Sequence, residues 1–268
     1  MTYCKNCGNK LPENAQYCPR CGAPVSARPA EKSSRSSQKA HPLSILSIAL
    51  IIAIVVAAVI AIPVILSGFF PGSQVVGSGN VQTQQKNISD FTSITVGSGF
   101  TVQITQSTSY AVSVTSDNNI LSHIQVFKTG TTLTITLQPM IGYQTTTLKA
   151  TISMPTLNEL QLSGGTTVSA TGFSSTNNFS TDLSGGSRLT MTGNANNLEA
   201  TCSGGSTINL SDFRVDNAQI VLSGGSHGTA YVTGRLDATL SGGSGLSYSG
   251  NPTLGNINSS GGSTISPG

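Results

Sequence analysis

The chain has 268 residues, a net charge of +3 and only 9% charged side chains, whereas about a quarter is usual in globular proteins. This small and dispersed charge argues against a nucleic-acid partner. Four of the five cysteines precede Gly22, a clustering that argues against a disulfide framework spread through a secreted fold.

The first segment, residues 1–25, contains two C-x2-C pairs, "CKNCG" and "CPRCG". Each pair brings two thiolates to one side of a metal, and Gly8 and Gly22 allow the backbone to turn so that amides face the sulfurs. Four protein ligands leave no open position, so the predicted site is structural and not catalytic. We predict a zinc ribbon that holds Zn²⁺ through Cys4, Cys7, Cys18 and Cys21.

Two disulfides are the alternative use of these cysteines, and residue types alone leave iron open as the metal. The stretch resembles the short zinc-ribbon domains at the N-termini of many prokaryotic membrane proteins. That resemblance predicts the metal, and a cytoplasmic protein is the expected partner of the ribbon. Nucleic acid is not expected, because basic side chains are few and Tyr3 and Tyr17 are the only aromatic residues of the segment.

Residues 26–42 are Ser-rich and basic and contain two prolines, which predicts a flexible linker. Residues 43–66 then carry no charged side chain, and a run of this length matches the ~20 residues that span a bilayer as a helix. We predict one transmembrane helix over residues 43–68. A buried core helix is disfavoured because no helical partner is adjacent, and a cleaved signal peptide because the run starts too late.

The charge asymmetry around this helix predicts its orientation. Only Glu13 and Glu31 are acidic before it, and no charged side chain follows it until Lys86. The basic residues before it are Lys5, Lys10, Arg20, Arg28, Lys32, Arg35 and Lys39. The prediction is a single-pass protein of the cell membrane with a cytoplasmic N-terminus, a second linker over residues 69–87 and an extracellular domain over residues 88–268.

The second half repeats Ser-Gly-Gly about every twenty residues. The repeated serines are Ser163, Ser184, Ser203, Ser223, Ser241 and Ser260. Apolar residues recur at every second position on both sides of the motif, which predicts two short strands for each repeat. Repeats that stack on one another explain both periods, and we predict an all-β fold, a parallel β-helix or solenoid, with Gly-Gly at the corners.

Ser-Gly-Gly could instead be a phosphate loop or a nucleophile, but no helix pattern follows it and His227 has no equivalent in the other copies. A structural corner is therefore preferred. Cys202 takes a column position otherwise held by leucine, which predicts a small buried side chain. Gly228 falls where another column expects an apolar residue, which predicts a local shift of the repeat by one or two residues.

Residues 88–160 alternate strongly between apolar and polar and are separated by turn residues such as "SDNN", which predicts strands with hairpin connections. The "GSG" sequences at 77–79 and 97–99 keep the spacing of about twenty residues. This spacing predicts that the solenoid starts, in degenerate form, before the first Ser-Gly-Gly.

Residues 88–265 resemble the auto-transporter adhesin head (GIN) domain family, through Phe91 with "ITVGSGF", the passage "ISMPTLNELQLSGG" and the Ser-Gly-Gly repeats. The resemblance implies a right-handed β-helix at the cell surface or in the envelope. It implies no established activity and supplies no catalytic residues.

Three functions follow as hypotheses. The first is a binding or structural, adhesin-like module that presents Ser, Thr and Asn to envelope glycans or cell-surface partners. The second is an envelope sensor that signals through the zinc ribbon. The third, an enzyme acting on polysaccharides, is not expected, because the outer acids share no single repeat position that would put two carboxylates in one cleft. These acids are Asp90, Asp117, Glu159, Asp182, Glu199, Asp212, Asp216 and Asp237.

Overall fold

The computed structural model describes residues 2–4, 6–11, 17–21, 74–139, 141–145, 147–174 and 177–268. The chain divides into two compact units, Met1–Phe69 and Phe70–Gly268. The predicted linker at 26–42 and the predicted transmembrane helix at 43–68 lie outside the described residues, and both stay predictions. Within the described ranges, no helix is at once long enough and apolar enough to cross a membrane.

The described part of the first unit is a β-hairpin with a second cysteine turn beside it. Strands β1 (Thr2–Tyr3) and β2 (Lys10–Leu11) pair antiparallel. The turn between them closes when the amide of Gly8, at φ +69°, donates to the carbonyl of Cys4 at 2.9 Å. Leu11 is buried with Cys4 and Cys18, so the core formed by the described residues of this unit consists mainly of its cysteines.

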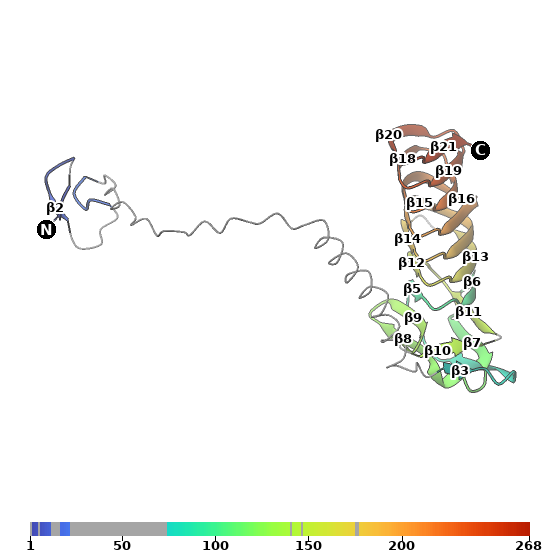
Figure 1. Cartoon of the computed structure of the whole chain (residues 1–268). Helices are drawn as coiled ribbons and strands as arrows, with labels where there is room; N and C mark the ends of the chain where they lie inside the picture. The colour runs from blue at the N-terminus through green and yellow to red at the C-terminus, as the bar shows by residue number, and fades with distance from the viewer. Residues whose placement is uncertain are drawn as a thin grey trace, which may run out of the picture. The chain divides into compact units, whose positions relative to one another are not determined.

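The described part of the second unit is β structure apart from one 3₁₀ turn, Leu121–His123. Figure 1 shows most of its strands stacked as successive coils. The strands are β3 (Gln74–Val76), β4 (Val81–Lys86), β5 (Ser93–Val96), β6 (Thr101–Gln106), β7 (Ala111–Asp117), β8 (Ile124–Thr129), β9 (Thr132–Leu137), β10 (Gly142–Gln144), β11 (Leu148–Met154), β12 (Glu159–Leu162), β13 (Thr167–Ser174), β14 (Phe179–Leu183), β15 (Arg188–Cys202), β16 (Thr207–Leu222), β17 (His227–Val232), β18 (Arg235–Leu240), β19 (Gly245–Ser249), β20 (Thr253–Ser259) and β21 (Thr264–Pro267).

Two faces of parallel strands run along the stack. The leading face, whose strands run into the Ser-Gly-Gly corners, contains in order β9, β5, β12, β14, the second half of β15, the second half of β16, β18 and β20. The trailing face, whose strands leave the corners, contains β11, β6, β13, the first halves of β15 and β16, β17, β19 and β21. The structure confirms the predicted all-β solenoid with two strands per repeat; the right-handed winding stays a prediction.

Each Ser-Gly-Gly corner is a tight turn that favours glycine at both central positions. Gly204 and Gly205 have φ of +61° and +74°, the two positive values that a type I′ turn requires. A Cβ on Gly204 would lie 3.2 Å from the amide nitrogen of Gly185 in the preceding coil, whereas a Cβ on Gly205 would meet nothing within 4 Å. The first glycine therefore also permits the close stacking of successive corners.

The inward side chains form continuous columns. Cys202 is completely buried between Leu183 and Leu222, as the sequence predicts. The predicted shift at Gly228 is wrong, because this residue pairs with Ile208 on one side and Leu246 on the other, in the register of the column. The register shifts of this region lie after the trailing-face halves of β15 and β16, between Thr190 and Thr192 and between Leu210 and Arg214.

The predicted early start of the solenoid is confirmed at Ser98–Gly99, which replaces Gly-Gly with φ of +64° and +75°. The next corner stacks on it, since the amide of Ser163 donates to the carbonyl of Val96 at 3.0 Å. The first "GSG", residues 77–79, does not form a solenoid corner. Its Gly79 amide instead donates to the buried carboxylate of Asp117 at 2.7 Å.

Antiparallel pairings close the end of the solenoid nearest its first coil, and among the described strands one of them, β8 with β9, is a hairpin of the kind expected for residues 88–160. Strands β8 and β9 pair antiparallel, and β7 pairs antiparallel with both β4 and β11. The structure differs from the predicted linker at residues 69–87, because 74–86 contain β3 and β4. Strand β4 is almost wholly exposed and polar, so no apolar alternation marked it as a strand.

Candidate functional site

The structure brings the four predicted zinc ligands together. All four cysteine sulfurs lie within 4.8 Å of one another, and none forms a disulfide. The Sγ atoms of Cys4 and Cys21 are 3.7 Å apart, and those of Cys7 and Cys18 are 3.6 Å apart. Tetrahedral zinc with Zn–S bonds of about 2.3 Å requires sulfur separations of roughly 3.8 Å, so the cluster fits the ion.

The surroundings favour the thiolate at Cys18, whereas the pKa of Cys7 is raised to about 12, because the Asn9 amide that lowers it is outweighed by the Cys21 thiol and burial. The backbone amide of Arg20 bonds the Cys18 sulfur and lowers the pKa of that thiol, and the side-chain amide of Asn6 donates to the Cys21 sulfur at 3.8 Å. Amide donors of this kind orient metal-bound sulfurs. This four-cysteine cluster therefore indicates a structural Zn²⁺, whose chemistry is to stabilise a segment too small for a hydrophobic core of its own.

The Ser-Gly-Gly serines do not form a catalytic array. The hydroxyl of Ser223 contacts the carbonyl of Cys202 at 3.5 Å, and within the described chain no hydrogen bond joins it to His227. The buried hydroxyl of each corner belongs instead to the residue after Gly-Gly. Thr166, Ser187, Ser206, Ser226 and Ser244 each donate to the carbonyl of the corner's own first serine at 2.7–2.8 Å. The motif is therefore a structural corner.

The outward side chains of the leading face form a row in which acids alternate with neutral residues. In register, Glu159, Ser180, Glu199, Gln219 and Asp237 follow one another from coil to coil. The expectation that the acids share no repeat position is wrong. Glu159, Glu199 and Asp237 each stand four residues before a corner serine, and counting from that serine would have revealed the row.

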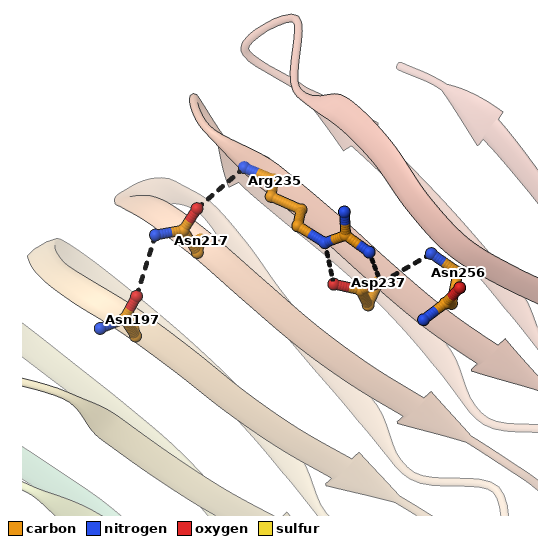
Figure 2. A network of polar contacts seen from close by, with 5 residues as sticks. All are labelled: Asn197, Asn217, Arg235, Asp237 and Asn256. Carbon is orange, nitrogen blue, oxygen red and sulfur yellow. Dashed lines mark hydrogen bonds and ion pairs between the residues drawn. The ribbon is translucent and has the colours of Figure 1, made fainter.

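An asparagine ladder runs beside this row, where the strands enter the leading face (Figure 2). The side-chain amide of Asn217 donates to Asn197 at 3.0 Å, and that of Asn197 donates to Asn178 at 2.7 Å. The ladder ends at Arg235, whose backbone amide donates to the side chain of Asn217 at 3.0 Å. The three asparagines and Arg235 each stand six residues before a corner serine, so counting from that serine would have revealed this ladder as well.

The carboxylate of Asp237 is saturated by its neighbours (Figure 2). It accepts bonds from Arg235 at 2.7 and 2.8 Å and from the backbone amide of Asn256 at 2.6 Å. The Arg235 bond, followed by the Asn256 bond, holds the pKa of Asp237 below its ordinary value. Glu199 and Asp237 line one hollow of about 340 Å³. A glycosidase needs a general acid with a raised pKa, whereas the pKa of Asp237 is lowered.

The trailing face has the opposite character. Its first outward row contains Lys149, Arg188 and His227, and its other members in register are threonines and Gly245. Its second row contains only Thr, Ser, Asn and Gln. The two faces of one solenoid thus differ in charge, with carboxylates on the leading face and basic side chains on the trailing face.

Two family models match separate parts of the chain. Residues 90–252 match the model described as "Putative auto-transporter adhesin, head GIN domain", and residues 3–25 match a zinc-ribbon domain. No curated protein matches the chain by sequence.

Solved structures share the fold of the second unit. A crystal structure described as a putative adhesin from Bacteroides fragilis NCTC 9343 is 20% identical, with a TM-score of 0.62 over 71% of this chain and 98% of that one. A putative adhesin from Parabacteroides merdae ATCC 43184 is 18% identical, with a TM-score of 0.52 over 72% and 98%. A putative lipid binding protein from Parabacteroides distasonis ATCC 8503 is 20% identical, with a TM-score of 0.51 over 72% and 98%.

Proposed function

Because this chain belongs to the auto-transporter adhesin head GIN domain family, we propose that it is a membrane-anchored envelope protein whose solenoid is an adhesin-like binding or structural module. The observation that carries the proposal is the pair of rigid outer faces, in which polar side chains recur coil after coil over one continuous core. The adhesin descriptions of two solved structures with the same fold support it.

The anchor in this proposal is the uncharged run at residues 43–66. The excess of Lys and Arg before it supports a cytoplasmic zinc ribbon and an extracellular solenoid. Reduced cysteines, which zinc binding requires, persist in the cytoplasm, so this orientation suits both units. The zinc ribbon would then serve as a docking module for a cytoplasmic protein.

We further propose a non-enzymatic role for the solenoid. The corner serines are used in turns, and Asp237 is held as a carboxylate by three donors. Binding requires only the repeated hydroxyl and amide groups of the outer faces.

Two measurements on cells that produce the full-length protein test this function. Antibodies to the solenoid should stain intact cells, and antibodies to the zinc ribbon should stain only permeabilised cells. Isolated envelope polymers and whole cells should bind the full chain more strongly than a matched chain in which an unrelated β-solenoid replaces residues 74–268. Equal binding by the two chains would contradict a binding role, and staining of the ribbon on intact cells would contradict the orientation.

A further inference from the structure

The trailing face has a hollow of about 480 Å³ over its last five coils. Gly245 creates it, because this glycine follows His227 in the outward row and leaves a gap before Thr264. A Cβ on Gly245 would lie 3.2 Å from the His227 ring, so the imidazole borders the gap directly. Ile208, Gly228 and Leu246 also line the hollow, with the side chains of Ile208 and Leu246 buried in the core beneath it.

Arg188 supplies the fixed positive charge of this hollow. It stands two coils before His227 in the same outward row, which places the two about 10 Å apart at the usual strand spacing. The Arg188 side chain is exposed, and its guanidinium has no hydrogen-bond or ion-pair partner among the residues that the structure describes. No carboxylate lines the hollow.

Arg235, the arginine of the leading face, differs from Arg188 in its surroundings. Its guanidinium is occupied by Asp237 (Figure 2), and the neighbouring asparagines satisfy one another. Glu199 adds a negative charge to the hollow on that side. An acidic ligand would therefore meet a free guanidinium on the trailing face and carboxylates on the leading face.

The groups around the trailing hollow select a chemical class of ligand. A guanidinium binds a planar carboxylate through two parallel hydrogen bonds. The remaining rim consists of hydroxyls and one amide, among them Thr190, Asn209 and Thr229, which suit sugar hydroxyls.

We propose that this hollow binds a carboxylate-bearing sugar, such as a uronic acid unit of an acidic polysaccharide, with Arg188 on the carboxylate and the hydroxyl rows on the ring. The inference rests on the proposed binding function and names its ligand class. Because equivalent groups recur on successive coils about 4.8 Å apart, a linear chain of such sugars can lie along the face.

The test measures binding of a galacturonic acid hexamer to the full-length protein in nanodiscs of uncharged lipid. Its fully methyl-esterified form is the neutral control, and polyglycerol phosphate is the control for a phosphate-bearing polymer. We expect the acid to bind, and both controls to bind about tenfold more weakly or not at all.

Two variants locate the site. Arg188→Gln should weaken binding of the acid by about tenfold, and Gly245→Val should do the same by filling the hollow. Arg214→Gln removes the same charge from an exposed site outside the hollow and should change binding by less than about twofold. Unchanged unfolding midpoints would show that all three variants are folded.

Each contrary result overturns the inference. Equal losses for Arg188→Gln and Arg214→Gln would mean diffuse charge attraction, and Arg188-dependent binding of the phosphate polymer would mean a different ligand class. Absence of acid binding by a protein that still binds isolated envelope polymers would refute the site and leave the proposed function standing. Absence of binding to both the galacturonic acid hexamer and the envelope polymers would refute the proposed binding function itself.

Discussion

The hydroxyl of Ser206 donates a 2.8 Å hydrogen bond to the carbonyl oxygen of Ser203, three residues earlier, inside one corner of the solenoid. Ser206 is fully buried, whereas Ser203 is only half-buried. A corner carbonyl that faces the core cannot reach water, and this hydroxyl satisfies it. The corner motif is therefore better described as Ser-Gly-Gly-Ser/Thr, in which the last residue carries the structural hydrogen bond.

The first prediction concerns this bond. Ser206→Ala removes the donor and leaves the buried carbonyl of Ser203 without it, so the free energy of unfolding should fall by about 1 kcal/mol. Ser203→Ala is the matched control and should change it by less than about 0.5 kcal/mol. Guanidinium unfolding of both variants measures the difference, and a larger loss for Ser203→Ala would reverse the assignment.

The second prediction separates the two corner glycines. Gly205→Ala imposes only the strain of a positive φ, which costs about 1 kcal/mol, because its Cβ would enter open space. Gly204→Ala imposes the same strain and also presses on the Gly185 amide of the preceding coil. Chemical unfolding should show a clearly greater loss for Gly204→Ala, and equal losses would mean that coil stacking tolerates a methyl group there.

The third prediction concerns the metal. The purified full chain should contain one zinc ion, and Cys18→Ser should lose it because three thiolates hold zinc far less tightly than four. Cys202→Ser should retain it, since Cys202 lies in the solenoid core. Elemental analysis gives the zinc content, and a chelator should abolish the fold of residues 1–25 while the unfolding midpoint of the solenoid stays unchanged.

The fourth prediction follows from the burial of Cys202. Burial in the core, together with the nearby charge of Asp182, raises the pKa of this thiol to about 12. With the four zinc ligands replaced by serine, a maleimide should leave Cys202 unmodified at pH 8 until guanidinium unfolds the chain. Ser203→Cys in the same background should react in the folded state. Rapid modification of Cys202 before unfolding would show that the column opens.

The fifth prediction is a pH dependence at Asp237. Its folded pKa lies below its ordinary value of 3.8, chiefly because Arg235 donates to it. A lowered folded pKa gives stability that is present above the unfolded pKa and is lost as the pH falls through the folded pKa. Asp237→Asn should therefore unfold at a lower temperature than the parent at pH 7, by a small margin for this partly exposed pair. The gap should begin to shrink below about pH 4 and close once the pH has fallen below the folded pKa, and a gap that widens in acid would contradict the assignment.

Much of this architecture is readable from sequence because the solenoid repeats locally. Each coil contacts the next one about twenty residues later, so a single period in Leu162, Leu183 and Leu222 exposes the core column. The zinc site is readable for a related reason, since the spacing of Cys4 and Cys7 is itself the geometry of a metal-binding turn.

The tertiary structure decided the strand register and the pairings between the corners, the core columns and the zinc ligands. Bulges absorb one or more residues in β15 and β16, and the register shows that Gly228 nevertheless stays in its column. Strand β4 has no alternating apolar side chains by which the sequence would predict it, and it forms through antiparallel pairing with β7. The sequence by itself determined the metal ligands, the corners, the buried columns and, through a constant spacing from each corner serine, the outward rows of the leading face. The pairing of distant strands decided how β4, β7 and β11 close the first coil, because strand register depends on contacts that no local pattern records.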